Sequence, residues 1–311
     1  MTSNMRLDAA GPSFPARRAA LVAAAVLAAL GLLLGSTLTG PADAAHAAVS
    51  AAKPDKPGKP GGGGGNGGGG GSGGGGSTEL EYAAVGDSFA AGAGGGSYLD
   101  TTCYRSSKSY PKLLDGDADK VLVAFPACSG ADTSDVIAQA ASVPTTAKVI
   151  TVTVGGNDVG FADVMQNCFV FVTSSCASKI AAGAAIVDSQ EFADDIALVV
   201  TTLRQRAPDA KVIVAGYPLL FWENGSGVNP KYAWADEVND ETVALNDRIQ
   251  GVVEVNGGVF VDVEDDFDGH GIGSSDPWIN DRNWLSLSTS FHPNATGYLA
   301  YAAAIREVPL Q

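Results

Sequence analysis

The chain has 311 residues, with 19 Lys and Arg against 34 Asp and Glu. Residues 1–78 hold six of the basic and three of the acidic residues, so residues 79–311 carry 13 and 31, a net charge of −18. Such an acidic surface repels phosphate backbones and anionic membranes, which argues against nucleic-acid binding.

The amino terminus has the pattern of an export signal. Basic residues, Arg17 and Arg18 among them, precede an apolar run at residues 19–33, and small residues follow. We expect residues 1–47 to be a signal peptide that is cleaved near residue 44 or 47, which makes the protein secreted. Two alternatives stay open: the apolar run could remain as an uncleaved N-terminal anchor, and the Arg pair suits either the twin-arginine route or an ordinary basic region.

A segment of extreme composition follows this signal. Residues 48–78 are rich in Lys and Pro and then almost pure Gly, which predicts a flexible linker because such a segment buries no apolar surface. A Gly-x-Ser-x-Gly match at residues 70–74 lies inside the linker, without a strand before it or a helix after it, so it does not indicate an α/β-hydrolase. We expect residues 79–311 to form one domain.

The domain alternates between two kinds of hydrophobic pattern. Short β-branched runs occur at residues 80–85, 121–125, 149–154, 212–215 and 259–263. Helical periodicity lies between them, notably over residues 192–203 and 238–252, and a last helix is expected after Pro293. This alternation predicts an α/β fold, a three-layer α/β/α sandwich around a parallel sheet.

Unusual polar segments follow three of these strands. Ser88 comes after the first strand, Ser129-Gly130 after the second, and Gly155-Gly156-Asn157-Asp158 after the third. The carboxyl ends of parallel strands share one edge of the sheet, where ligands bind. The sequence therefore predicts a site that combines all three segments.

These segments contain the parts that acyl transfer requires. Ser88, before a Gly- and Ala-rich turn, is the candidate nucleophile. The base must titrate near neutrality, and the domain has only His270 and His292. His292 is favoured because Pro293 and the expected helix fix its backbone, whereas His270 lies in a glycine loop.

An oxyanion needs hydrogen-bond donors. The candidates are the backbone N–H groups of Ser88 and Gly130 and the side-chain amide of Asn157. The structural alternative is a loop glycine and a helix-capping asparagine. We expect Asp158 to cap the following helix rather than to act in the chemistry.

All four cysteines lie in the expected exported domain, where an even number favours disulfides. Two local bridges, Cys103–Cys128 and Cys168–Cys176, are the expected pairing among the three that four cysteines allow. A zinc site is the weaker alternative because no Cys-x-x-Cys pair is present and only two histidines could join it. We expect no metal and no cofactor.

Four sequence blocks together resemble the SGNH (GDSL) hydrolases, and secreted actinobacterial esterases and lipases most of all. The blocks are Gly86-Asp87-Ser88-Phe89, Ala127-Cys128-Ser129-Gly130-Ala131, Gly155-Gly156-Asn157-Asp158-Val159-Gly160-Phe161 and Phe291-His292-Pro293-Asn294. They occur in the family's order and span essentially the whole domain. Further similarity lies in Tyr110-Pro111, Gly216-Tyr217-Pro218 and the segment at residues 276–280. The resemblance implies a flavodoxin-like sheet and metal-free hydrolysis of carboxylic esters through an acyl-enzyme.

Carried over motif by motif, the resemblance implies that Ser88 attacks the substrate and His292 takes the serine proton. It also implies that Gly130 and Asn157 donate hydrogen bonds to the oxyanion. Most members have an Asp three residues before the histidine, where this chain has Thr289. Some actinobacterial members lack that Asp and use a main-chain carbonyl instead. We therefore expect a Ser-His dyad in which the Thr289 carbonyl orients the imidazole.

The resulting hypothesis is a secreted serine esterase or lipase that acts on small-molecule or lipid esters. We expect a monomer with no nucleic-acid partner and no stable membrane insertion after signal cleavage. A carbohydrate O-acetyl esterase would use the same site and is the alternative enzyme. The alternative of another class is a tethered, non-catalytic binding module, although a module without activity has no physical reason to keep nucleophile, base and oxyanion donors together.

Overall fold

A computed structural model describes residues 79–117, 119–222 and 232–310. All of them belong to the expected domain. The expected signal peptide and linker, residues 1–47 and 48–78, lie outside the described residues.

Five parallel strands form the central sheet in the order β4-β1-β5-β6-β7. The strands are β1 (Leu80–Gly86), β4 (Lys120–Ala124), β5 (Val149–Thr153), β6 (Lys211–Ala215) and β7 (Val259–Val261). All five coincide with the β-branched runs of the sequence. The strand β4 is added on one side of β1, and β5, β6 and β7 follow in turn on the other side. This is the flavodoxin-like order, and it creates a switch point between β1 and β5.

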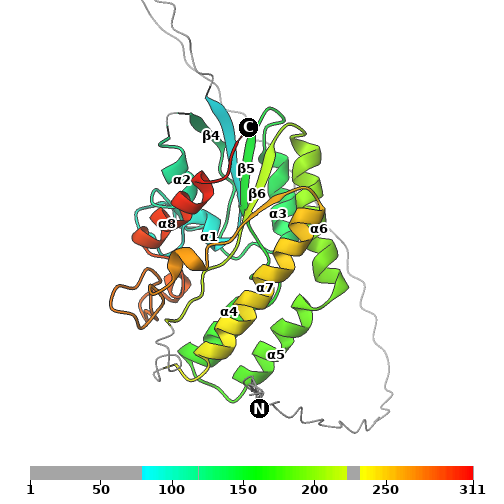
Figure 1. Ribbon diagram of the computed structural model, residues 1–311. Coiled ribbons are helices and arrows are strands. Elements are labelled where there is room, and N and C mark those ends of the chain that lie inside the picture. Colours follow the sequence, from blue (N-terminus) through cyan, green and yellow to red (C-terminus); the bar gives the residue numbers. More distant parts are fainter. Residues whose placement is uncertain (1–78, 118, 223–231, 311) are drawn as a thin grey trace, which may run out of the picture. The chain divides into compact units, whose positions relative to one another are not determined.

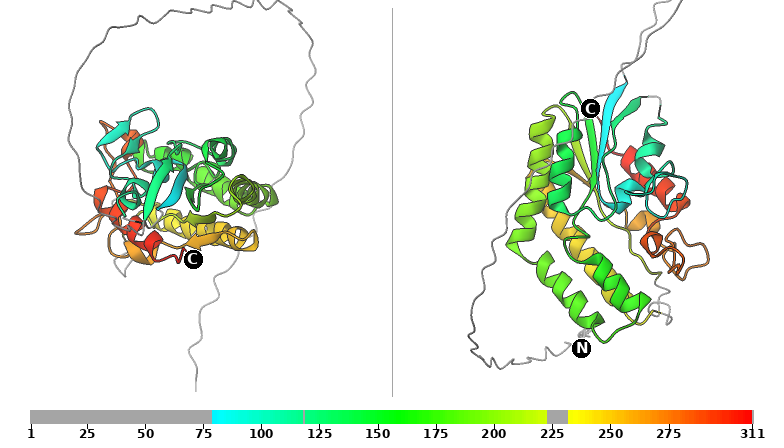
Figure 2. Two further views of the ribbon diagram at one scale, coloured as in Figure 1. Left: turned by 90° about the horizontal axis from the view of Figure 1, so that it is seen from above. Right: turned by 180° about the vertical axis from the view of Figure 1, so that it is seen from behind.

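Helices cover both faces of this sheet, as Figures 1 and 2 show. One layer contains α1 (Ser88–Ala91), α2 (Tyr110–Leu114) and α8 (Ala295–Arg306), and the other contains α3 (Thr133–Gln139), α6 (Gln190–Arg206) and α7 (Ala235–Val255). Two further helices, α4 (Phe161–Met165) and α5 (Cys176–Val187), extend beyond the carboxyl edge of the sheet beside α7. The α/β/α sandwich is confirmed.

Shorter elements complete the connections. They are the antiparallel pair β2 (Tyr98–Asp100) and β3 (Arg105–Ser106), the 3₁₀ turns η1 (Ala140–Ser142), η3 (Asp265–Phe267) and η4 (Leu287–Thr289), and the π-helical turn η2 (Gln166–Val170).

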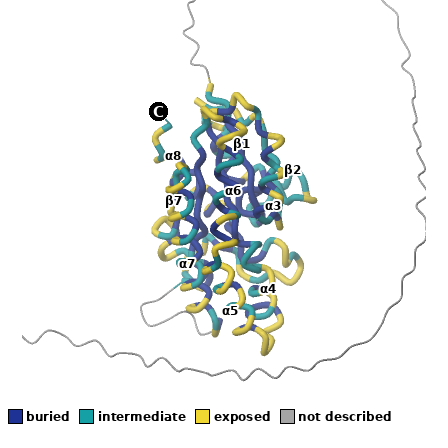
Figure 3. The backbone as a smooth tube through the Cα atoms, turned by 90° about the vertical axis from the view of Figure 1, so that its right-hand side faces the viewer, coloured by how far each residue is buried: buried dark blue, intermediate teal, exposed yellow. Residues whose placement is uncertain are grey.

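The core lies between the sheet and its two helical layers. All five residues of β5 are buried, which fits a strand with neighbours on both edges and helices on both faces. On α6, the predicted apolar face is buried along its whole length from Phe192 to Leu203. Figure 3 shows buried residues along the strands and exposed residues on the outer helical surfaces. This rigid centre fixes the loops at the carboxyl edge of the sheet.

Candidate active site

Ser88 lies where β1 turns sharply into α1. Gly86 ends the strand with φ +127°, and a Cβ there would lie 2.5 Å from the Thr153 carbonyl oxygen, so only glycine fits. Asp87 then caps α1, because its Oδ1 accepts a hydrogen bond of 2.9 Å from the Phe89 N–H. The turn places Ser88 in the first position of α1, at the carboxyl edge of the sheet.

His292 contacts this serine across 204 residues of sequence. The distance from Ser88 Oγ to His292 Nε2 is 2.7 Å, and His292 Nδ1 lies 2.7 Å from the Ser290 carbonyl oxygen. The expectation for Thr289 is therefore wrong, since the carbonyl that orients the ring belongs to Ser290. The reason is local: Phe291 has φ +61°, which turns the chain so that the Ser290 carbonyl faces the imidazole two residues later.

The hydrogen bonds fix the tautomer of His292. A carbonyl oxygen only accepts, so Nδ1 carries the proton and Nε2 is left to accept the Ser88 hydroxyl. Burial lowers the pKa of His292 from 6.5 to about 4, and the bond to the Ser290 carbonyl opposes this effect. Within the described ranges no carboxylate is hydrogen-bonded to the ring. The imidazole of His292 is therefore neutral at pH 7.

Three hydrogen-bond donors lie on the segments around Ser88. In the part of the chain that the structure covers, the N–H groups of Ser88 and Gly130 have no hydrogen-bond acceptor. The Asn157 amide donates a hydrogen bond of 2.8 Å to the Ala131 carbonyl, which ties it to the Gly130 loop and uses one of its two amide hydrogens. These are the donors that we expect to form an oxyanion hole.

Asp158 does not cap the helix that follows it. The N-cap of α4 is Gly160, whereas both Asp158 carboxylate oxygens accept from the first residue of α3, Thr133, at 2.6 to 3.2 Å. The expectation was wrong because the carboxylate meets a helix brought close by the tertiary fold. Asp158 thus links the loop after β5 to the loop after β4, which hold Asn157 and Gly130 respectively.

A buried network of hydrogen bonds, which the sequence did not reveal, supports the turn from β1 into α1. The Asp87 carboxylate accepts hydrogen bonds from Thr153 Oγ1 at 2.5 Å and from Tyr217 Oη at 2.6 Å. Tyr217 Oη in turn accepts from the Gly156 N–H at 3.1 Å. Burial raises the pKa of Asp87 from 3.8 to about 6, while its hydrogen bonds lower it. The Gly-Tyr-Pro segment after β6 was the available signal, but its partner lies 130 residues away.

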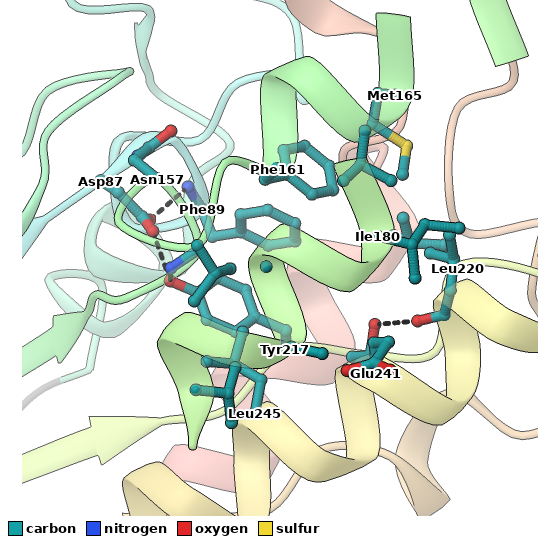
Figure 4. A pocket seen from close by; sticks show the side chains of 18 of the residues that line it. Asp87, Phe89, Asn157, Phe161, Met165, Ile180, Tyr217, Leu220, Glu241 and Leu245 are labelled. Atoms are coloured by element: carbon teal, nitrogen blue, oxygen red, sulfur yellow. Dashed lines mark hydrogen bonds between the residues drawn. The ribbon is translucent and has the colours of Figure 1, made fainter. Parts of the chain in front are cut away.

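An apolar pocket opens beside Ser88, and Figure 4 shows the side chains around it. Its floor is formed by residues after β1, β5 and β6, and its walls mostly by apolar side chains of α4, α5 and α7, among them Met165, Ile180 and Leu245, with Glu241 and Thr242 of α7 as polar members. The empty space, counted out to the open mouth, is about 740 Å³. Such a pocket beside a serine hydroxyl is suited to an apolar substrate group.

His270, the other candidate base, is engaged in its own loop. Its ring stacks on Trp278 with centroids 3.5 Å apart, and Nδ1 lies 2.8 Å from the Asp276 carbonyl oxygen. No hydrogen bond between the described residues joins His270 to Ser88. The structure therefore brings His292, and not His270, to the serine.

Both expected disulfides are present, Cys103–Cys128 and Cys168–Cys176. The Cys128 N–H donates to the Gly86 carbonyl at 2.9 Å, so the first bridge lies directly beside the turn from β1 into α1. The second bridge closes the loop between α4 and α5.

Among the residues with described positions, no group of three or more His, Cys, Asp or Glu could hold a metal ion. None of the described helices has the length and apolarity that a membrane span needs.

Comparison with known proteins gives this geometry a context. The chain is 35% identical over 219 residues to Lipase 1 of Streptomyces coelicolor, and the match covers 70% of this chain and 81% of the relative. Residues 84–300 match the model of the GDSL-like lipase/acylhydrolase family. The chain belongs to this family. It is an ester hydrolase of the GDSL type with an α/β fold.

Solved structures agree with this assignment. The crystal structure of the extracellular lipase from Streptomyces rimosus is 34% identical, with a TM-score of 0.67, and the match covers 74% of this chain and 100% of that one. Phospholipase A1 from Streptomyces albidoflavus NA297 is 33% identical, with a TM-score of 0.66, over 74% of this chain and 99% of that one.

Proposed function

We propose that this GDSL hydrolase is a secreted serine esterase or lipase that hydrolyses acyl esters with a Ser88–His292 dyad. The observation that carries the proposal is the 2.7 Å contact between Ser88 Oγ and His292 Nε2, in a ring whose other nitrogen is held by a carbonyl. A serine hydroxyl paired with a neutral, oriented imidazole is an activated nucleophile.

The reaction proceeds in two halves. Ser88 Oγ attacks the ester carbonyl carbon while His292 Nε2 takes its proton, and the tetrahedral oxyanion accepts hydrogen bonds from the Ser88 and Gly130 N–H groups and the Asn157 amide. His292 gives the proton to the leaving alcohol, which leaves an acyl-Ser88 ester. Water then attacks the acyl carbon while His292 takes its proton, and the return of this proton to Ser88 Oγ releases the acid. Since the Ser290 carbonyl is neutral, it stabilises the transient imidazolium less than a carboxylate would.

The substitution Ser88→Ala tests this mechanism. We expect ester turnover to fall at least about 10³-fold, and His292→Ala to cause a similar loss. Ser178→Ala is the matched control, because Ser178 is an exposed serine of α5. Turnover of p-nitrophenyl butyrate is the assay, and a burst of p-nitrophenol in wild type reports the acyl-enzyme. Full activity in Ser88→Ala would refute the proposal that Ser88 and His292 act as a catalytic dyad.

The pocket favours an acyl chain over an acetyl group. A substrate that ends at one methyl group would leave most of the apolar walls from α4, α5 and α7 uncovered. We expect p-nitrophenyl esters of four or more carbons to be turned over with higher kcat/KM than the acetate. A preference for acetyl esters, with faster release of polysaccharide acetate, would support the O-acetyl esterase instead.

Secretion and a monomeric state belong to the same proposal. Residues 1–47 act as export signal and residues 48–78 as linker, which fits two disulfides in the domain and an extracellular lipase among the relatives. The secreted enzyme is proposed to be a monomer without nucleic-acid partners. Mass spectrometry of the mature protein and light scattering after gel filtration test these two points.

A further inference from the structure

Five large apolar side chains project into solvent from two neighbouring loops. They are Phe171 and Val172 between α4 and α5, and Trp284, Leu285 and Leu287 in the loop before His292. Leu285 is 97% exposed, and Val172 is 65% exposed. We call these five residues the loop-tip patch. Exposed apolar clusters of this kind mark interaction surfaces on soluble proteins.

The two loops are joined to one another. The rings of Phe171 and Trp284 have centroids 6.4 Å apart, and the Arg282 guanidinium lies 4.8 Å from the Trp284 ring. Arg282 Nη1 also donates to the Phe169 carbonyl at 2.5 Å. The two segments of the loop-tip patch therefore meet at Phe171 and Trp284.

The same loops contact the surroundings of His292. Phe169, at the base of the first loop, packs against Phe291 with centroids 6.0 Å apart. Ser290, in the second loop, orients His292 through its carbonyl, and its hydroxyl accepts from the Asn283 N–H at 2.8 Å. In Figure 1 the second loop, in orange, lies at the same end of the sheet as α4. The bases of the two loops that carry the loop-tip patch thus contact the surroundings of the proposed dyad.

The composition of the loops identifies the partner. Residues 168–176 and 283–291 contain no Asp, Glu, Lys or Arg, although 44 of the 233 residues from 79 to 311 are charged. Aromatic and aliphatic tips between serine and threonine hydroxyls suit the boundary between water and lipid, where one end of a side chain is apolar and the other hydrated. A net charge of −18 over residues 79–311 repels anionic surfaces.

The backbone of the first loop supports the same conclusion. Val172 has φ +49°, a conformation that β-branched residues rarely adopt, and yet its side chain points into water. The Cys168–Cys176 bridge closes this loop at its base. A strained and exposed apolar side chain is the kind of outlier from which a functional role can be inferred.

We propose that the loop-tip patch docks on the surface of an uncharged or zwitterionic lipid aggregate and presents its esters to Ser88. This inference rests on the proposed function. Docking adds no chemical step, because it only brings the dyad to the interface. Its measurable consequence is that lipid binding and turnover of aggregated esters depend on the patch, whereas turnover of dissolved esters does not.

The experiment measures binding of the mature protein to phosphatidylcholine vesicles by co-sedimentation. The variant is Phe171→Ser with Leu285→Ser, and the matched control is Leu198→Ser with Val255→Ser, two exposed apolar residues of α6 and α7. We expect the patch variant to bind at least about tenfold more weakly than wild type, because two apolar side chains no longer enter the lipid. The control should bind within about twofold of wild type.

Kinetics with two substrates accompany the binding assay. The patch variant should keep its kcat/KM for dissolved p-nitrophenyl acetate and lose about tenfold on an emulsified long-chain ester. Wild type that does not bind the vesicles, a patch variant that binds as wild type does, or binding to anionic vesicles alone would each overturn the inference.

A third variant separates this inference from the proposed function. Ser88→Ala should bind vesicles normally while it hydrolyses nothing. If wild type binds vesicles but hydrolyses no ester, the proposed function fails and the docking surface stands. If wild type hydrolyses dissolved esters but does not bind, only the docking surface fails. Quenching of Trp284 fluorescence by brominated lipid, abolished in Trp284→Phe, would show directly which side chain enters the lipid.

Discussion

Asp87 and His292 are both buried, and burial shifts their pKa values in opposite directions. The substitution Asp87→Asn should reveal the opposite effects of these two groups on the pH dependence of stability. Burial raises the pKa of Asp87 to about 6, whereas an unfolded chain has an aspartate pKa near 3.9. Between these values the folded protein holds a proton that the unfolded chain lacks. Stability from this group is therefore greatest at low pH, and about 3 kcal/mol is lost as pH rises from about 4 to about 6.

His292 has the opposite sign. Its pKa is about 4 in the folded protein and near 6.5 in an unfolded chain, so between these values the unfolded chain binds the extra proton. Stability from this group is present above pH 6.5, and about 3 kcal/mol is lost as pH falls to about 4. In wild type the two effects nearly cancel between about pH 4 and 6.

Asp87→Asn removes the first effect and keeps the helix cap, because asparagine is an equally good N-cap residue. Relative to wild type, the free energy of unfolding of the variant should fall by about 3 kcal/mol as the buffer is taken from pH 6.5 to 4. Urea titrations at half-unit pH steps measure this difference. His292→Gln should give a difference of opposite sign.

Asp209→Asn is the control, because Asp209 is an exposed carboxylate paired with Lys148, which holds its pKa below the usual value. Its difference from wild type should be small and opposite in sign to that of Asp87→Asn. Parallel pH profiles of wild type and Asp87→Asn from pH 4 to 6.5 would refute the reasoning.

Three further predictions concern activity. The acid limb of kcat/KM should lie near pH 4 and not near 6.5, because His292 stays neutral down to that pH; a midpoint above pH 6 in a pH-rate profile would contradict this. Asn157→Ala should lower kcat by about 10²- to 10³-fold through loss of one oxyanion donor, while Asn167→Ala, a partly exposed control beyond α4, leaves kcat within about twofold. Thr289→Ala should leave kcat within about threefold, because the Ser290 carbonyl orients the base; a loss above about 30-fold would restore Thr289 to that role.

The sequence predicted the sheet and the neighbourhood of the site for a simple physical reason. Parallel strands have β-branched runs that can be read directly, and their carboxyl ends converge on one edge, so Ser88, Gly130 and Asn157 had to approach one another. His292 could be chosen from two histidines because a proline and a helix start follow it. The catalytic roles of these residues stay predictions until the variants are measured.

What the sequence missed depends on backbone angles and distant contacts. The choice of the Ser290 carbonyl over that of Thr289 follows from the positive φ of Phe291, and no residue type signals a left-handed phenylalanine. The partner of Asp158 was missed because Thr133 is 25 residues away. Likewise, the bond from Tyr217 to Asp87 joins the loop after β6 to the end of β1 and is visible only once the strand order is known.

The Cys103–Cys128 bridge connects the proposed oxyanion site to the redox state of the protein's surroundings. Cys128 lies two residues before Gly130, and the Ser129 N–H donates to the Cys103 carbonyl at 3.0 Å, so the crosslink anchors the loop that carries one proposed oxyanion donor. Reducing surroundings leave such a pair open, whereas oxidising ones close it. A copy still inside the producing cell would hold its donor on an unanchored loop. For the secreted enzyme that we propose, this bridge would close after export, so the Gly130 loop would reach its crosslinked form outside the producing cell.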